Sequence, residues 1–192
     1  MNKSRLEAFS DGVIAIIITI MVLELKVPHG ETIDVLSPIW PVFIAYVLSF
    51  VNLGIYWVNH HHLLQATRHV SGSVLWANLH LLFWLSLIPF TTGWMGENHF
   101  ATVPTAVYGV VLVMSALAYT ILQSALKKHD HGQDSILADA IGKDLKGKAS
   151  LAIYIAAVLL AFVNHWIALA MYVLVAVIWF VPDSRIEKRF HK

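Results

Sequence analysis

Two carboxylates, Glu7 and Asp11, come just before a long apolar run near the start of the chain. A membrane-crossing helix built on that run must begin near Arg5, which places Asp11 about 9 Å deeper than Arg5 along the helix. An unpaired carboxylate at that depth costs several kcal/mol, so Asp11 requires partners from other helices. A buried carboxylate of this kind can organise a helix bundle or carry a proton.

Polar side chains elsewhere in the sequence are candidate partners for Asp11. The chain contains 11 histidines, three of them consecutive at His60, His61 and His62. The depth of each residue along its own predicted helix brings four polar side chains to the level of Asp11, in one layer near the cytoplasmic side. These candidate partners are His61, His62, Asn78 and His80.

Clustered histidines also raise the hypothesis of a transported-metal site, because imidazole is the commonest protein ligand for zinc and similar ions. Adjacent residues on a helix point about 100° apart, so three consecutive histidines cannot all face one ion. No second His, Asp or Glu lies four residues from any of the three. The spacing therefore disfavours a metal site, and we expect none.

The composition places these residues in a membrane protein. Of the 192 residues, 58% are apolar and 13% are charged, and the mean hydropathy is +0.68. Soluble domains average about 45–50% apolar and about 25% charged residues. The hydrophobic pattern predicts six spans, at about 5–27, 39–66, 73–96, 102–127, 149–164 and 166–182. The chain has no cysteine, which excludes disulfides and thiolate chemistry.

The apolar runs are uninterrupted rather than alternating, so we expect one all-α domain over 1–192, an integral membrane bundle of six transmembrane helices. With both termini in the cytoplasm, only Lys26 of the 13 Lys and Arg residues would lie outside, which satisfies the positive-inside rule. The cytoplasmic loop 128–148 has the spacing of a short amphipathic helix on the inner surface. A polar stripe on the second span should face protein. It comprises Ser49, Asn52, Tyr56 and Asn59.

The first span opens with a recognisable motif. Arg5, Phe9, Ser10 and Asp11 form the pattern R-x-x-x-F-S-D, which resembles the signature of bacterial homologues of the lysosomal potassium channel called transmembrane protein 175. The position of the motif at the start of span one and the six-span count strengthen this resemblance. Two further stretches, Trp57 to His61 and residues 87–90, contribute to it, so the resemblance covers the whole chain in layout.

The resemblance implies a homotetramer whose four first helices line a central ion path. It also implies that Ile16, Ile20 and Leu23 form the pore constriction, and that the four motif residues hold the helices together near the cytoplasmic side. The spacing agrees, because these three residues lie within about 60° around the helix, with Thr19 on the same stripe. Four copies would stack apolar rings that can gate by dewetting. Without the resemblance, lipid contact or ordinary helix packing would explain the same stripe.

These features predict a potassium-permeable cation channel in the cell membrane, multi-pass and of the bacterial inner membrane type. We expect potassium as the permeant species, no cofactor, and further copies of the chain and membrane lipid as partners. The balanced net charge of +1 does not suggest nucleic acid. A proton-coupled secondary transporter that uses Asp11 and the histidine layer is the alternative, and a non-conducting membrane scaffold is a third. No enzyme motif is present, and the absence of a T-V-G-Y-G filter predicts a moderate potassium preference.

Overall fold

The computed structural model describes residues 3–67, 70–129 and 144–180. Within these ranges every regular element is a helix, which confirms the predicted all-α fold. The helices are α1 (Lys3–Leu23), the 3-10 helix η1 (Ile33–Ile39), α2 (Trp40–Gln65), α3 (Gly72–Ser86), α4 (Ile88–Glu97), α5 (Thr102–His129), α7 (Leu145–Ala161) and α8 (His165–Phe180).

Four helical stretches in the described part of the chain are long and apolar enough to cross a membrane. They cover Lys3–Leu23, Ile33–Gln65, Gly72–Glu97 and Thr102–Lys128. The helices α7 and α8 have 17 and 16 residues, or about 25 Å each at 1.5 Å per residue, which is less than the hydrocarbon thickness of about 30 Å. The chain is a multi-pass membrane protein. That α7 and α8 also cross, and that both termini are cytoplasmic, stay predictions.

The structure divides the predicted third span, 73–96, into two consecutive helices. The helix α3 ends at Ser86, and α4 begins at Ile88 with Pro89 in its first turn. Proline has no backbone N–H, and its ring clashes with the carbonyl four residues earlier, so a continuous helix cannot pass through it. The first turn of a new helix tolerates proline, because its N–H groups have no helical partners.

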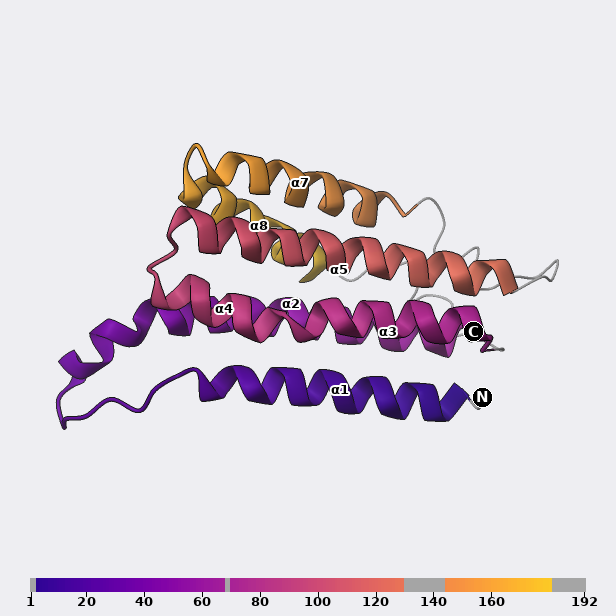
Figure 1. The fold of residues 1–192 in the computed structure, drawn as a ribbon, viewed down its shortest axis with the longest axis horizontal. Helices are drawn as coiled ribbons and strands as arrows, with labels where there is room; N and C mark the ends of the chain where they lie inside the picture. Colours follow the sequence, from indigo (N-terminus) through magenta and orange to yellow (C-terminus); the bar gives the residue numbers. More distant parts are fainter. Residues whose placement is uncertain (1–2, 68–69, 130–143, 181–192) are drawn as a thin grey trace.

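The helices run side by side in one bundle, with α1 at one edge and α7 at the opposite edge in the view of Figure 1. The helix α1 packs against α2, α3 and α4, whereas α5 packs against α3, α4, α7 and α8. The segment between α1 and α2, including η1, projects beyond the bundle at the end away from the N-terminus (Figure 1). Because α1 lies at the edge, one of its sides has no neighbour within the subunit.

The polar stripe predicted on the second span does face protein. Ser49 Oγ donates a hydrogen bond to the Tyr108 hydroxyl over 3.0 Å, and Asn52 Nδ2 donates to the same oxygen over 3.3 Å. Further along α2, the Tyr119 hydroxyl donates to the backbone carbonyl of Asn59 over 3.1 Å. Hydrogen bonds of this kind satisfy polar groups that lipid could not, and they join α2 to α5.

Most of the loop 128–148, in which we predict an amphipathic helix, falls on residues 130–143, which lie outside the described residues. The helix α7 begins at Leu145, four residues before the predicted span 149–164. Asp144 explains the earlier start, because its Oδ1 accepts a hydrogen bond from the Gly147 N–H over 3.1 Å. This N-cap contact satisfies one of the free N–H groups in the first turn of the helix.

Candidate functional site on the first helix

The helix α1 has two different faces in the subunit. One face is buried against the bundle and comprises Leu6, Ser10, Ile14, Ile17 and Met21. The opposite face is exposed and contains the predicted constriction residues: the exposed fractions are 58% for Ile16, 43% for Ile20 and 76% for Leu23. Thr19 lies on the same face, and its hydroxyl donates to the Ile16 carbonyl over 3.0 Å. We call these four residues the exposed stripe.

A groove of about 470 Å³ runs beside the exposed stripe, between α1 and α4. Its wall is mostly apolar, with Glu24 as the charged member. The groove is lined by Val13, Ile16, Ile17, Ile20, Glu24, Ser86, Pro89 and Phe90. The groove and the stripe form one continuous apolar surface, and a surface of this kind is covered by lipid or by another protein copy.

Behind the exposed stripe, the motif residue Ser10 joins a buried chain of hydrogen bonds. Asn78 of α3 donates from Nδ2 to Ser10 Oγ over 2.9 Å, and its Oδ1 lies 2.7 Å from Nε2 of His60 on α2. Because the Asn78 oxygen can only accept, His60 must donate through Nε2. All three side chains are buried, so this chain joins α1, α2 and α3 at one point.

Asp11 has a partner that the sequence analysis did not select. Its Oδ1 accepts a hydrogen bond from Nε1 of Trp57 on α2 over 3.0 Å. The imidazole ring of His61 stacks on the Trp57 indole, with a centroid distance of 6.2 Å. His61 therefore packs against the donor of Asp11 rather than bonding to Asp11.

Of the four predicted motif partners, only Asn78 hydrogen-bonds to the motif among the described residues, and it binds Ser10. His80 accepts a hydrogen bond from Trp84 Nε1 over 3.0 Å within its own helix. The Nδ1 atom of His62 is buried without a hydrogen-bond partner in the described part of the chain. The expectation that His61, His62 and His80 bind Asp11 is therefore not met in this structure.

The position of each residue along its predicted span gave the correct level in the bundle for the partners of the motif. It did not predict which face of α2 points toward α1. Neighbouring residues on a helix differ by about 100° in direction, so His60 and His61 point to different neighbours. The sequence did contain a signal for His60, which follows Ser49 by 11 residues, three helical turns, and so shares its face. Trp57 also had a signal, because an indole N–H within a membrane span needs an acceptor.

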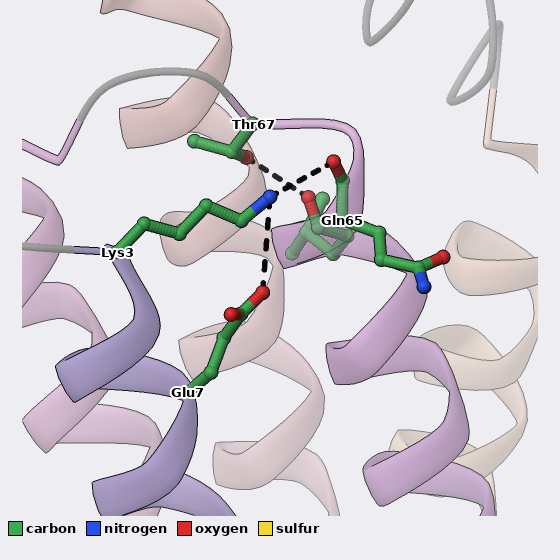
Figure 2. A network of polar contacts seen from close by, with 5 residues as sticks. Lys3, Glu7, Gln65 and Thr67 are labelled. Carbon is green, nitrogen blue, oxygen red and sulfur yellow. Dashed lines mark hydrogen bonds and ion pairs between the residues drawn. The ribbon is translucent and has the colours of Figure 1, made fainter.

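Lys3 makes an ion pair and a hydrogen bond at the start of α1, as Figure 2 shows. Lys3 Nζ lies 3.8 Å from Glu7 Oε1 and donates to the Gln65 carbonyl over 3.0 Å. This carbonyl is in the last turn of α2, where carbonyls have no helical partner. Arg5 and Phe9 are exposed on the single subunit, and no hydrogen bond or ion pair joins Arg5 to another described residue. Their bracing role stays a prediction.

A second ionic contact holds the other end of α1. Lys26 Nζ, just after the helix, donates to Oε1 of Glu97 at the end of α4 over 2.7 Å. This hydrogen bond and the charge of Glu97 raise the pKa of Lys26. The Glu24 carboxylate packs over Gly93, where an added Cβ would lie 3.2 Å from Oε2. Carboxylates therefore gather beside the end of the exposed stripe.

In the ranges that the structure describes, no group of three or more His, Asp or Glu side chains is placed to hold a metal ion. The histidine triplet of α2 spreads over different faces, with His60 buried and His61 exposed. The chemistry that the site offers is therefore that of a surface: an apolar stripe on a helix held at both ends.

Comparison with known proteins identifies a family and several relatives to which this chain is similar. The sequence family described as endosomal/lysosomal potassium channel TMEM175 matches residues 5–89. A potassium channel from Chryseobacterium sp. is 55% identical over 188 residues, which covers 98% of this chain and 97% of that protein. A potassium channel from Chamaesiphon minutus is 33% identical and covers 92% of each chain.

A solved structure shares the fold. The crystal structure of a lysosomal potassium-selective channel TMEM175 homolog from Chamaesiphon minutus matches with a TM-score of 0.80 at 28% identity, over 93% of this chain and 96% of that chain. The human endosomal/lysosomal proton channel TMEM175 is 38% identical over a stretch that covers 35% of this chain and 17% of that protein. With its helical membrane fold and its full-length similarity to bacterial potassium channels, the chain belongs to the TMEM175 family.

Proposed function

We propose that the chain is the subunit of a potassium-permeable cation channel, a homotetramer whose α1 helices surround a central ion path. The exposed stripe is the observation that carries this proposal, because it places Ile16, Ile20 and Leu23 outside a subunit that packs the opposite face of α1. The names of the full-length relatives, potassium channels in Chryseobacterium sp. and Chamaesiphon minutus, support potassium as the permeant ion.

In this assembly each apolar position of the stripe forms a ring of four side chains around the axis. Rings of branched apolar side chains narrow a pore and can close it by expelling water. The Thr19 hydroxyl lies between these rings and uses its proton in a bond to the Ile16 carbonyl. Its oxygen lone pairs therefore remain available to a passing cation.

Ion preference in this mechanism arises without a cage of carbonyl oxygens, since the sequence has no T-V-G-Y-G filter. We expect a moderate preference for potassium over sodium, set by the width of the apolar rings. Four copies of Glu24 at one end of the path would raise the local cation concentration by their field.

The motif residues hold α1 in the orientation that this pore requires. Ser10 and Asp11 bond to α3 and α2 from the inner side of α1. In the proposed assembly, Arg5 and Phe9, which are exposed on the single subunit, contact the neighbouring subunit. The motif thus braces the pore near the predicted cytoplasmic side without touching the ion.

Potassium efflux from liposomes that contain the purified protein tests the proposal, with sodium as the comparator and no proton gradient. A channel releases potassium passively, whereas a transporter that couples a proton through Asp11 requires a proton gradient. Ile16→Asn makes one ring polar, so it should raise the flux and lower the preference for potassium. Ile155→Asn is the matched control, because Ile155 of α7 is also exposed on the subunit. Proton-dependent flux, or equal effects of the two substitutions, would contradict the proposal.

The shared axis is tested by cross-linking, which is simplified because the chain has no cysteine. Disulfides form only when Cα atoms approach to about 4.4–6.8 Å. Leu23→Cys in membranes should therefore give disulfide-linked dimers under mild oxidation, because four thiols meet at the axis. Leu159→Cys, from a similarly exposed position on α7, should stay monomeric. Dimers from Leu159→Cys alone would place the contact between subunits on α7 instead of α1.

A further inference from the structure

A second cavity lies away from α1, between α2, α5 and α7, with Trp179 of α8 in its wall. Its volume is about 50 Å³. Most of the side chains that line it carry a polar group, although most of the wall surface consists of their carbon atoms. The polar side chains include Asn52, Tyr56, Asn59, Tyr119, Ser150 and Tyr154.

Several of these groups have hydrogen-bonding capacity that the protein itself does not use. The Tyr56 hydroxyl has no hydrogen-bond partner among the described residues. The Tyr154 hydroxyl reaches Asn52 Oδ1 only at 3.5 Å, which is longer than an ordinary O–H···O bond. A polar group without a partner inside a membrane protein is costly. The hydroxyls of Tyr56 and Tyr154 and the Oδ1 atom of Asn52 can therefore each bind a further partner, although Asn52 Nδ2 already donates to the Leu48 carbonyl and the Tyr108 hydroxyl.

Water fits the size of this cavity, and the polar groups of Tyr56, Tyr154 and Asn52 can bind it. A buried water needs about 10–15 Å³ of such space and two to four polar partners. By that measure a cavity of 50 Å³ has room for about three water molecules. We propose that each subunit holds a hydrated pocket at this position, in which water bridges Tyr56, Tyr154 and Asn52. None of the lining residues belongs to α1, so the pocket is separate from the proposed ion path.

The pocket adjoins a series of hydrogen-bonded polar side chains in the middle of the bundle. Asn52 bonds through Nδ2 to the Tyr108 hydroxyl over 3.3 Å, and Ser49 bonds to the same hydroxyl over 3.0 Å. Water beside Asn52 and Tyr154 would complete this chain from the surface of the pocket to Tyr108. The hydrated pocket thus explains how α2 carries a row of polar residues through a bundle that spans a membrane.

The beginning of α7 is the side from which we expect water to reach the pocket. Asp144 and Gly147, at the beginning of α7, belong to the pocket wall, and Asp144 is partly exposed. The helix has 17 residues, or about 25 Å, which is shorter than a hydrocarbon layer of about 30 Å. A short helix thins the bilayer around it or draws in its polar end. In the predicted topology this end faces the cytoplasm.

Labelling of single introduced thiols tests the proposal, since the chain has no cysteine of its own. Ala116 lines the pocket, whereas Ala118 on the same helix is buried and is not part of the wall. The cysteine thiolate attacks a methanethiosulfonate reagent, forms a mixed disulfide and releases methanesulfinate. Because the thiolate forms only where water reaches the thiol, Ala116→Cys should react at least about tenfold faster than Ala118→Cys. Ala118 lies about 3 Å nearer than Ala116 to the Lys128 end of α5, which is the predicted cytoplasmic end. If depth alone decided the rate, a reagent from that side would therefore label Ala118→Cys faster.

A second pair keeps the test decisive if Ala116→Cys does not fold. Thr120 lines the pocket one turn nearer to Asp144, whereas its neighbour Ile121 does not line it. Both residues are exposed on the subunit, so the pair differs in contact with the pocket rather than in exposure. Gel filtration and retained potassium flux identify folded variants in liposomes. Faster labelling at the pocket position than at its control supports the hydrated pocket. Equal rates within a folded pair would show that the pocket position is no more accessible to water than its control, and would overturn the proposal. Neither result depends on the effect of Ile16→Asn.

Discussion

Trp57 donates a hydrogen bond from its indole nitrogen to the Asp11 carboxylate over 3.0 Å and so joins α2 to α1. The preceding residue, Ser10, accepts a hydrogen bond from Asn78 and joins α1 to α3. Two adjacent residues of α1 thus bind two different helices. Such a pair of contacts fixes the rotation of α1 about its own axis, and that rotation decides which side chains form the exposed stripe.

Replacing Trp57 by Phe should lower the midpoint of thermal unfolding of the detergent-solubilised protein. The substitution keeps an aromatic ring but removes the hydrogen-bond donor of Asp11, and a hydrogen bond to a charged group contributes about 1.5–3 kcal/mol. The control is Trp76→Phe, because the exposed indole of Trp76 has no hydrogen bond to another described residue. Equal losses of stability in the two variants would show that the bond to Asp11 does not matter.

Asn78→Ala should destabilise the protein more than Ser10→Ala, because Asn78 bonds to two buried side chains and Ser10 to one. Asn78→Ala leaves both Ser10 and His60 without a partner, and each buried group left unsatisfied costs about 1–3 kcal/mol. Unfolding followed by circular dichroism measures the difference. Ser86→Ala provides an exposed serine on the same helix as Asn78 and should have little effect. A larger loss for Ser10→Ala than for Asn78→Ala would contradict this ordering.

Gly96→Ala should separate α4 from α2, whereas Gly54→Ala should not. A Cβ on Gly96 would lie 2.7 Å from the Cα of Val42, which is backbone and cannot move aside, but a Cβ on Gly54 meets nothing within 4 Å. We expect a loss of about 1–3 kcal/mol for Gly96→Ala from overpacking. Gly54→Ala should be neutral or stabilising by about 0.5–1 kcal/mol, because alanine favours helix. Thermal unfolding of both variants tests the contrast, which fails if Gly54→Ala is the more damaging.

The helices were predictable from the sequence, because a long apolar run bounded by Pro, Gly and charge satisfies its backbone hydrogen bonds in lipid by forming a helix. The stripe of Ile16, Ile20 and Leu23 was predictable too, since helical spacing alone places these residues on one side. The division of the third span into two helices could also have been predicted, because Pro89 cannot continue a helix.

The partner of Asp11 could not be predicted in the same way. Depth along a span is linear in residue number, but the direction of a side chain changes by about 100° per residue. The contact with Trp57 also depends on how α2 is rotated against α1, which packing over the whole helix decides. The same reason explains why His60, and not His61 or His62, bonds to Asn78.

The amine of Lys26 should titrate above its ordinary pKa of 10.5, because the protonated form donates a hydrogen bond to Glu97. A raised pKa means that the contribution of the pair to stability is complete below pH 10.5 and is lost as the pH rises through the raised value. Glu97→Gln should return the pKa toward 10.5, as measured by NMR of labelled lysine side chains. Glu31→Gln, an exposed control in the same segment, should not.

Ile20→Ala should raise the potassium flux, because it removes three carbon atoms from each side chain of one proposed ring and widens the apolar constriction. Val22→Ala is the control on the same helix, since the exposed fractions of Ile20 and Val22 are 43% and 45%. Val22 lies about 160° from Ile20 around the helix, so its truncation should affect lipid contact and leave the flux unchanged. Flux from liposomes with matched protein content separates the two cases. If both variants conduct like the parent protein, Ile20 does not line the ion path, and if Val22→Ala alone conducts more, a different face of α1 does.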